Sequence, residues 1–424
     1  MFTNSIPFSS HHVCLFDICT LGLHRKSLKG LLFLRFVNVL IVLSHIGFAM
    51  AYIFVTLPLK DDKGVTQNGQ IGVDIPPSEI KMLEKKRIEC LHVFDNAKKQ
   101  PADSLRLESE FILKMVEYVD LYVSALINMV KLYPSFAVKM YYTWASPLGE
   151  SQCIAYDDYR YELVAIYYNL AAYFVNMAQH LSVQANVGSA SRYEKDSYRG
   201  LLRAAGYFAL AHNVLNDMKL QRIGVAEMPF VLDNVIDLFC FLETLSLAQA
   251  QEIGTTRSLQ ADSKQSSDLS TRLCHQLFLL YKQCKEISCR IGSSSKHFLM
   301  ISTLCEIKID VFSVLTYNYA ASWAFSSSPS NGLWFINRAR SGVADLQKRS
   351  KSYASMKSFY NCERFLQTCY STVKRNDERL RKINSLVHRT KMAEGEVPLP
   401  LPQVLAVKEK IELPIELPKT VTNQ

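Results

Sequence analysis

The cysteines, histidines and acidic pairs of this sequence could in principle do chemistry, but their spacing argues against a catalytic or metal centre. There are 11 cysteines and 10 histidines, yet no Cys-x-x-Cys pair occurs. The tightest later pair, Cys284 and Cys289, has no histidine cluster beside it. A zinc site requires four ligands that are usually brought together by short spacings, so none is expected. Scattered cysteines in helical segments act as small buried apolar residues.

The sequence patterns of common enzyme sites are also absent. There is no Gly-x-Gly-x-x-Gly, Walker loop, Gly-x-Ser-x-Gly or His-Glu-x-x-His. Asp157 and Asp158 form one conspicuous acidic pair, but adjacent residues of a helix do not face each other. Because acidic residues stabilise the amino-terminal end of a helix, we expect this pair to cap one. The sequence therefore predicts a protein that is not an enzyme and has no cofactor, metal or small-molecule substrate.

The composition favours a folded protein. Of 424 residues, 49% are hydrophobic and 21% are charged, with only 16 glycines and 14 prolines. This much apolar surface can offset the conformational entropy lost on folding, which excludes a collagenous or disordered chain. The odd, scattered set of cysteines fits a reducing cytoplasm better than a disulfide framework.

Positive charge is concentrated towards the carboxyl end. Residues 338–391 hold 14 lysines and arginines and four acidic residues, whereas the whole chain has a net charge of +9. Two interpretations stay open: a solvated helix face, or a patch for an anionic membrane surface or an acidic partner. Nucleic acid is not expected, because no aromatic platform is interleaved with the charges. The candidate patch comprises Arg338, Arg340, Lys348, Arg349, Lys374, Arg375, Arg379, Arg381 and Lys382.

The amino-terminal region supports two conflicting predictions. An uncharged run of 22 residues, 36–57, follows a basic flank and is long enough to span a bilayer as a signal anchor. However, residues 52–60 are rich in β-forming side chains, which predicts a short strand, and Pro58 marks where the β-rich run stops. A transmembrane anchor within residues 31–57 is therefore an alternative to a strand over residues 52–60.

The middle of the chain has the periodicity of helices. After a glycine-bearing stretch up to Pro76 and Pro77, which predicts a loop, apolar residues recur at steps of three and four, for example over 161–181 and 268–291. Residues 78–390 thus predict six to nine long helices and no strands, with a turn at 326–332. Pro229 and Asp268 fit helix starts. The proline-rich stretch from Val397 cannot be helical throughout and is expected to be extended.

Three sequence blocks resemble the signature of the BRO-one domain family, in the family's order and spacing. Residues 156–181 contain an aromatic–Glu pair and a Tyr-Asn-Leu-Ala-Ala stretch, residues 203–215 an Ala-Ala-Gly-x-Phe helix, and residues 245–253 an Ala-Gln-Ala-Gln-Glu motif. The resemblance implies that the signature residues build the fold rather than bind a partner. They are Tyr161, Glu162, Asn169, Gly206, Gln249, Gln251 and Glu252.

The resemblance implies a mainly α-helical, boomerang-shaped solenoid of tetratricopeptide-like helices with a small N-terminal β-sheet. It covers residues 50–414, which we expect to form the domain, followed by a short tail over 415–424. Residues 1–49 would be an extension, either a gene-model artefact or the possible anchor. In size the chain is similar to the single-domain BROX-type members, although its last residues include no cysteine for prenylation.

The family resemblance also implies a partner. Family members bind the carboxyl-terminal amphipathic helix of an ESCRT-III subunit, charged multivesicular body protein four, in an apolar groove. The groove's aliphatic pair corresponds to Leu269 and Leu273, for which ordinary core packing is the alternative role. The family's aromatic anchor falls near Gly254, where this chain has no aromatic residue, so Leu259 is the candidate in its place.

The implied function is a non-enzymatic adaptor of endosomal sorting and membrane remodelling, cytoplasmic and peripheral on endosomal or other membranes. One alternative is a membrane-anchored helical protein held by residues 31–57. Another keeps the BRO-one fold but makes it a scaffold for a small GTPase or a pH-signalling partner.

Overall fold

The computed structural model describes part of the chain in detail. The described residues are 57, 59–60, 62–67, 75–97, 99, 107, 109–137, 140–145, 153–187, 190–221, 231–261, 267–292, 295–350 and 362–418. All belong to the second of two compact units, residues 48–424. The predicted anchor and extension lie outside the described residues, except for Leu57. Among the described helices, none has both the length and the apolarity needed to cross a membrane.

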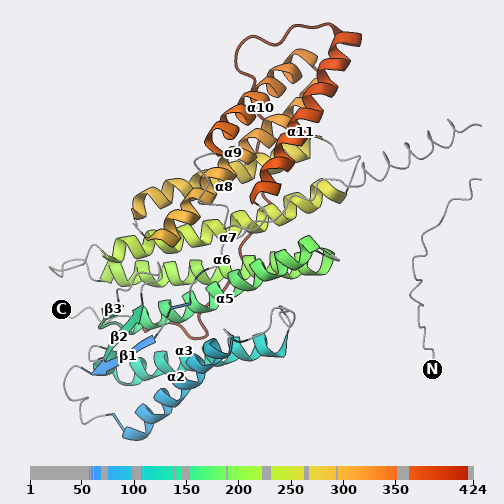
Figure 1. Cartoon of the computed structure of the whole chain (residues 1–424). Helices are drawn as coiled ribbons and strands as arrows, with labels where there is room; N and C mark the ends of the chain where they lie inside the picture. The colour runs from blue at the N-terminus through green and yellow to red at the C-terminus, as the bar shows by residue number, and fades with distance from the viewer. Residues whose placement is uncertain are drawn as a thin grey trace, which may run out of the picture. The chain divides into compact units, whose positions relative to one another are not determined.

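The fold is mainly helical, as predicted (Figure 1). The strands are β1 (Asp62–Gln67), β2 (Met140–Ala145) and β3 (Cys153–Tyr156). The helices are α2 (Pro77–Ala97), α3 (Glu110–Leu132), the short α4 (Pro134–Ala137), α5 (Tyr159–Val187), α6 (Ala190–Gln221), α7 (Val231–Ala261), α8 (Ser267–Ile291), α9 (Lys296–Phe325), α10 (Pro329–Ser350), α11 (Cys362–Ile383) and a π-helical turn, η4 (Asn384–His388).

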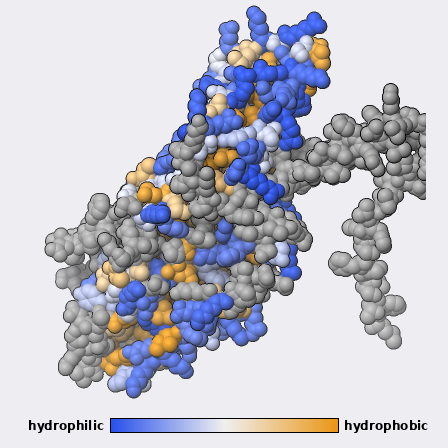
Figure 2. Space-filling view, viewed as in Figure 1, coloured by the Kyte–Doolittle hydropathy of each residue, from blue (hydrophilic) through white to orange (hydrophobic). Residues whose placement is uncertain are grey.

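Helices that follow one another in the sequence pack side by side. α5 packs on α6, α6 on α7, α7 on α8, α8 on α9 and α9 on α10, while α11 contacts both α9 and α10. α2 and α3 form a further pair that contacts α5. Apolar residues of α5 are buried on all its sides, from Leu163 to Leu181, as expected of a helix covered by neighbours on several faces. On the face in Figure 2, hydrophobic residues form separate patches among hydrophilic ones.

The small sheet corrects the prediction that residues 78–390 contain no strands. β1, β2 and β3 form an antiparallel sheet in that order. β2 has six residues and β3 only four, too short for a clear alternating pattern in the sequence. β1 lies in the glycine-bearing stretch that was predicted to be a loop. Its Gly64 has a positive φ of 103°, at the irregularity in strand pairing between Asp62 and Val65.

The predicted strand over residues 52–60 is not part of this sheet where the chain is described. Leu57, Leu59 and Lys60 lie in no strand. Instead, two asparagines of α5, seven residues apart and hence on one face, bind this backbone as a neighbouring strand would. The Asn176 side chain accepts from the Leu57 amide (2.7 Å) and donates to its carbonyl (2.8 Å). Asn169 pairs in the same way with the Lys60 amide and carbonyl, at 2.7 and 3.1 Å.

The buried carboxylate of Glu162 joins the sheet to three helices. It is fully buried in the first turn of α5. It accepts hydrogen bonds from Trp144 Nε1 of β2 (2.6 Å), Tyr122 Oη of α3 (3.0 Å) and Arg87 Nε of α2 (2.8 Å). Arg87 also donates to Asp62 of β1 (2.6 Å). Although burial alone would lower it, these two carboxylates raise the pKa of Arg87, so the guanidinium stays charged.

The helix ends follow the sequence signals in part. Asp158 caps α5, as predicted, since its carboxylate accepts from the Arg160 amide at 2.9 Å. Asp268, predicted as the start of α8, lies in its first turn, because the helix begins one residue earlier at Ser267. The turn predicted at 326–332 is shorter, because α10 already begins at Pro329. Pro229 lies outside the described residues.

Lys60 gives a testable link between this packing and pH. Burial lowers the pKa of Lys60 to about 7, although the charge of Glu162 opposes the shift. Above pH 7 the folded protein therefore releases a proton that the unfolded chain keeps, so the free energy of unfolding should rise with pH. The slope contributed by one such proton is at most about 1.4 kcal/mol per pH unit. We expect urea denaturation between pH 7 and 8.5 to show this slope in the wild type and to lose it in Lys60→Met. Equal slopes in both proteins would contradict the assignment.

Candidate partner-binding surface

The α7–α8 hairpin carries the predicted groove residues and is fixed by a buried ion pair. Glu252 of α7 accepts from Lys308 Nζ of α9 at 2.5 Å and from Tyr281 Oη of α8 at 2.7 Å. Glu252 and Lys308 are fully buried. Removing one partner of such a pair leaves a buried charge and typically costs about 3–5 kcal/mol. The last residue of the Ala-Gln-Ala-Gln-Glu motif thus locks three successive helices together.

The three predicted groove residues lie at the same end of this hairpin. Leu259 lies two residues before the end of α7, and Leu269 lies two residues after the start of α8. Because these helices are consecutive and pack side by side, both residues lie near the same end of the pair. Both are half-buried. Leu273, one turn further along α8, is fully buried. Of the three predicted groove residues, Leu259 and Leu269 therefore keep part of their apolar surface exposed, whereas Leu273 belongs to the core.

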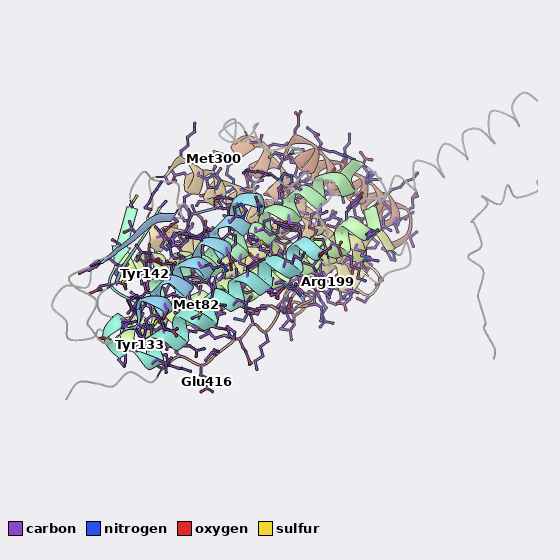
Figure 3. The ribbon with its side chains drawn as sticks, turned by 90° about the horizontal axis from the view of Figure 1, so that it is seen from below. Met82, Tyr133, Tyr142, Arg199, Met300 and Glu416 are labelled. Carbon is purple, nitrogen blue, oxygen red and sulfur yellow. The ribbon has the colours of Figure 1, made fainter. Side chains whose placement is uncertain are left out.

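The proline-rich carboxyl-terminal segment is extended and crosses this helix stack. Its backbone bonds first to α8, where Arg272 donates to the Leu401 carbonyl and accepts from the Gln403 amide. It then bonds to Gln251 of α7, whose side chain accepts from the Leu405 and Ala406 amides (2.7 and 2.9 Å) and donates to Gln403. The segment can be followed in Figure 3 to Glu416. The segment is thus extended, as predicted, and it packs against the domain.

Two glycines allow this close approach. On α6, a Cβ at Gly206 would collide with the Glu409 carbonyl oxygen and with Ile411. On α7, a Cβ at Gly254 would lie 3.1 Å from Leu405 Cδ1. Gly254 is the position where the family resemblance implies an aromatic anchor. In this chain Leu405 of the carboxyl-terminal segment packs at that position instead.

The remaining signature residues are also buried. Tyr161 is buried, lies 4.8 Å from Tyr156 between ring centroids, and is contacted by Lys60 Nζ at 4.9 Å from its ring. Gln249 is buried on α7, and its Oε1 has no hydrogen-bond partner among the described protein atoms. With Glu162, Asn169, Gln251 and Glu252 placed above, every signature side chain lies inside the fold.

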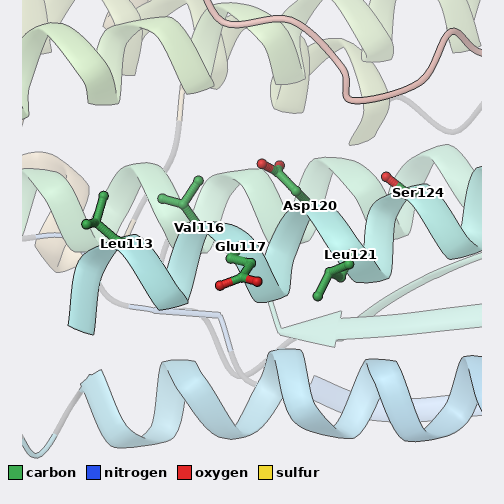
Figure 4. A pocket seen from close by; sticks show the side chains of 6 residues that line it. All are labelled: Leu113, Val116, Glu117, Asp120, Leu121 and Ser124. Atoms are coloured by element: carbon green, nitrogen blue, oxygen red, sulfur yellow. The ribbon is translucent and has the colours of Figure 1, made fainter. Parts of the chain in front are cut away.

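An open depression of about 360 Å³ lies along α3, where Leu113 is 59% and Leu121 44% exposed (Figure 4). Asp120 and Ser124 point to the same side of α3 there, and burial raises the pKa of Asp120. No cluster of metal-binding side chains is present in the parts of the chain that the structure describes.

The predicted basic patch is divided between two helices. Its first four residues lie on α10 and its last five on α11. All nine predicted basic residues are exposed. Some have acidic neighbours, as in the pairs Arg349–Asp310 (2.8 Å) and Arg381–Asp377 (2.6 Å). In both pairs the arginine stays about half exposed (53% and 45%), while its aspartate is mostly buried (12% and 17%).

Together these features define an α-helical domain of stacked antiparallel helices with a small antiparallel sheet. A family model described as the BRO1-like domain matches residues 79–420, so the chain belongs to the BRO1-like domain family. No curated protein matches the sequence.

Solved structures share the fold at low sequence identity. "ALIX BRO1 CHMP4C complex" is 15% identical with a TM-score of 0.60, covering 88% of this chain and 99% of that one. "Crystal Structure of ALIX in complex with the SIVmac239 PYKEVTEDL Late Domain" is 14% identical with a TM-score of 0.60, covering 87% and 50%. "Structure basis for endosomal targeting by the Bro1 domain" is 17% identical with a TM-score of 0.59, covering 85% and 94%.

Sequence reasoning missed the residues that hold distant segments. Asn176, seven residues after Asn169, could have been found from that spacing, since both lie on one face of α5. Lys308 had no such signal. A lysine in an apolar helix is fully buried only where a carboxylate pairs with it, and the sequence does not show which carboxylate lies beside it. Leu405 could not have been matched to Gly254 without the path of the carboxyl-terminal segment.

Gly206→Ala tests how this segment is held. The alanine gains up to about 1 kcal/mol of helix propensity, but its methyl group meets a backbone carbonyl. We therefore expect a net loss of about 1–3 kcal/mol in urea denaturation and faster proteolysis within residues 397–418. Gly254→Ala is the matched control, because its methyl group meets only the end of the Leu405 side chain and should have a smaller effect. If residues 397–418 of Gly206→Ala resisted proteolysis as well as those of the wild type, this view of the contact would be wrong.

Proposed function

We propose that this protein is a non-enzymatic adaptor that binds the carboxyl-terminal amphipathic helix of an ESCRT-III subunit in endosomal sorting and membrane remodelling. The observation that carries the proposal is the rigid α7–α8 hairpin, which presents Leu259 and Leu269 together at one end. Amphipathic helices bind such surfaces through apolar anchors spaced three or four residues apart. A relative of the same fold is described in complex with CHMP4C, an ESCRT-III protein, which supports the same kind of partner here.

The binding surface would differ from the family pattern in one respect. The family's aromatic anchor is replaced by Gly254, against which Leu405 packs. The half-buried Leu405 and Leu259 would then supply the apolar surface that the aromatic ring supplies in relatives. Leu273 would act as the packed support of Leu269.

We further propose that the protein is cytoplasmic and associates peripherally with endosomal or other membranes. The exposed basic side chains of α10 and α11 support this, because each basic residue near an anionic leaflet contributes about 1 kcal/mol of attraction. Another solved structure of this fold is described as the basis for endosomal targeting by the Bro1 domain, which supports an endosomal location here.

Leu269→Asp is the sharpest test of the helix-binding proposal. Leu269 is half-buried, so the change should spare the fold, whereas an aspartate at the fully buried position 273 would place a charge in the core. We expect the wild type to bind a fluorescent peptide of the ESCRT-III helix with micromolar affinity, about −8 kcal/mol. The variant should bind at least about tenfold more weakly, a loss of about 1.4 kcal/mol.

The matched control is Leu279→Asp, which makes the same change on α8 at a side chain 36% exposed and ten residues away. It should keep wild-type affinity. Equal affinity of the Leu269 variant, with a circular dichroism spectrum like that of the wild type, would refute the proposed groove. Equal loss in both variants would show a general effect of charge on α8 instead.

A further inference from the structure

The turn that follows α11 exposes apolar side chains that the helix-binding proposal does not use. In η4, Leu386 is 66% and Val387 68% exposed, and Met392 is 47% exposed just beyond it. Apolar residues clustered at this level of exposure are typical of a docking surface. They contrast with α11 itself, whose apolar residues Phe365, Val373 and Leu380 are buried.

The turn is held in one conformation. Arg389 adopts a left-handed conformation (φ 51°), and its amide closes the turn on the Asn384 carbonyl at 2.6 Å. The Asn384 side chain then binds Thr390 three times, through the Thr390 amide (3.2 Å), hydroxyl (2.9 Å) and carbonyl (3.0 Å). Because a left-handed conformation is uncommon for arginine, these bonds must hold the turn against strain.

The turn is also fixed to the helix stack. The His388 ring packs edge-on against Phe325 of α9, with centroids 5.4 Å apart. The Ala393 amide donates to the Ser330 carbonyl of α10 at 3.1 Å. Because these contacts hold the turn against α9 and α10, Leu386 and Val387 are exposed without further rearrangement.

Positive charge surrounds these apolar side chains. Residues 374–392 contain seven lysines and arginines and two acidic residues, a net charge of +5. One of the acidic residues, Asp377, is already paired with Arg381. Lys382 precedes Leu386 by four residues, which places it alongside in the helix, and Arg389 and Lys391 follow within five residues. All three are exposed.

We propose that the turn over residues 384–392 docks on an anionic phospholipid bilayer. Leu386 and Val387 insert between the lipid headgroups, and Lys382, Arg389 and Lys391 contact the phosphates. Exposed apolar side chains flanked by basic ones are typical of interfacial membrane binding, in which apolar burial and charge attraction add. An acidic protein groove would pair with the cations alone, whereas a bilayer takes up both the cations and the exposed apolar side chains. This inference rests on the proposed membrane association but is independent of the ESCRT-III helix.

Sedimentation of the full-length protein with vesicles tests the inference. Vesicles of phosphatidylcholine alone are compared with vesicles that also contain phosphatidylserine. The readout is the difference between the two, because binding that needs no negative charge cancels in it. We expect the wild type to show this difference, and Leu386→Asp/Val387→Asp to reduce it at least about tenfold.

The matched control is Ile88→Asp/Leu132→Asp, which changes residues that are 66% and 69% exposed on α2 and α3. It should keep the wild-type difference. Arg389→Glu/Lys391→Glu should also lose it, and added salt should weaken wild-type binding.

The outcomes separate the two levels of the proposal. No difference in the wild type would overturn both the membrane association and this site. A wild-type difference that survives in Leu386→Asp/Val387→Asp would overturn the site alone and leave membrane association to other basic residues. An equal loss in the Ile88→Asp/Leu132→Asp control would also overturn the site.

Discussion

The buried carboxylate of Glu162 is the interaction on which the amino-terminal half of the fold depends. Three donors from β2, α3 and α2 meet it, and Arg87 extends the network to β1. A fully buried charge is tolerated only with this many partners. The sheet is small and its strands are short, so side-chain bonds to α5 rather than its own ladder fix its position. Asn169 and Asn176 of the same helix then hold the chain segment before the sheet. α5 thus contacts and positions the described segments that precede it in the sequence.

The carboxyl-terminal half uses the same principle with different residues. Glu252, Lys308 and Tyr281 tie α7, α8 and α9 through one buried ion pair and one hydrogen bond. Gln251, the neighbour of Glu252, points to the other side and binds the extended segment over residues 403–406. Two adjacent residues of one sequence block therefore connect both the helices that follow them and the end of the described chain. This explains why polar residues stand in a helix whose other faces are apolar.

The helices could be predicted from the sequence because their apolar side chains recur at steps of three and four over many turns. The family resemblance implied structural roles for the signature residues, and in the structure Glu162 and Glu252 are fully buried and hydrogen-bonded. The strands could not be predicted in this way. β3 has four residues, and β1 depends on the positive φ of Gly64 and on pairing with β2, some 75 residues later. The half-burial of Leu269 and the full burial of Leu273 likewise depend on neighbours that helical periodicity does not name.

The carboxyl-terminal segment connects the two proposed surfaces. It leaves the turn at residues 384–392, bonds to Ser330 of α10 at Ala393, and reaches the α7–α8 hairpin at residues 401–406. An extended chain, which lacks the repeating backbone hydrogen bonds of a helix, is positioned by its attachments to other elements. The contacts at Asn384 and Ala393 fix one end of this span, and Gln251 fixes the other. Between these ends, Arg272 of α8 binds Leu401 and Gln403. Leu405 is therefore held beside Gly254 by bonds to α7 and α8, whereas the turn is held by its own contacts with Phe325 of α9 and Ser330 of α10. The same segment thus belongs to both surfaces, but each surface is fixed by separate contacts.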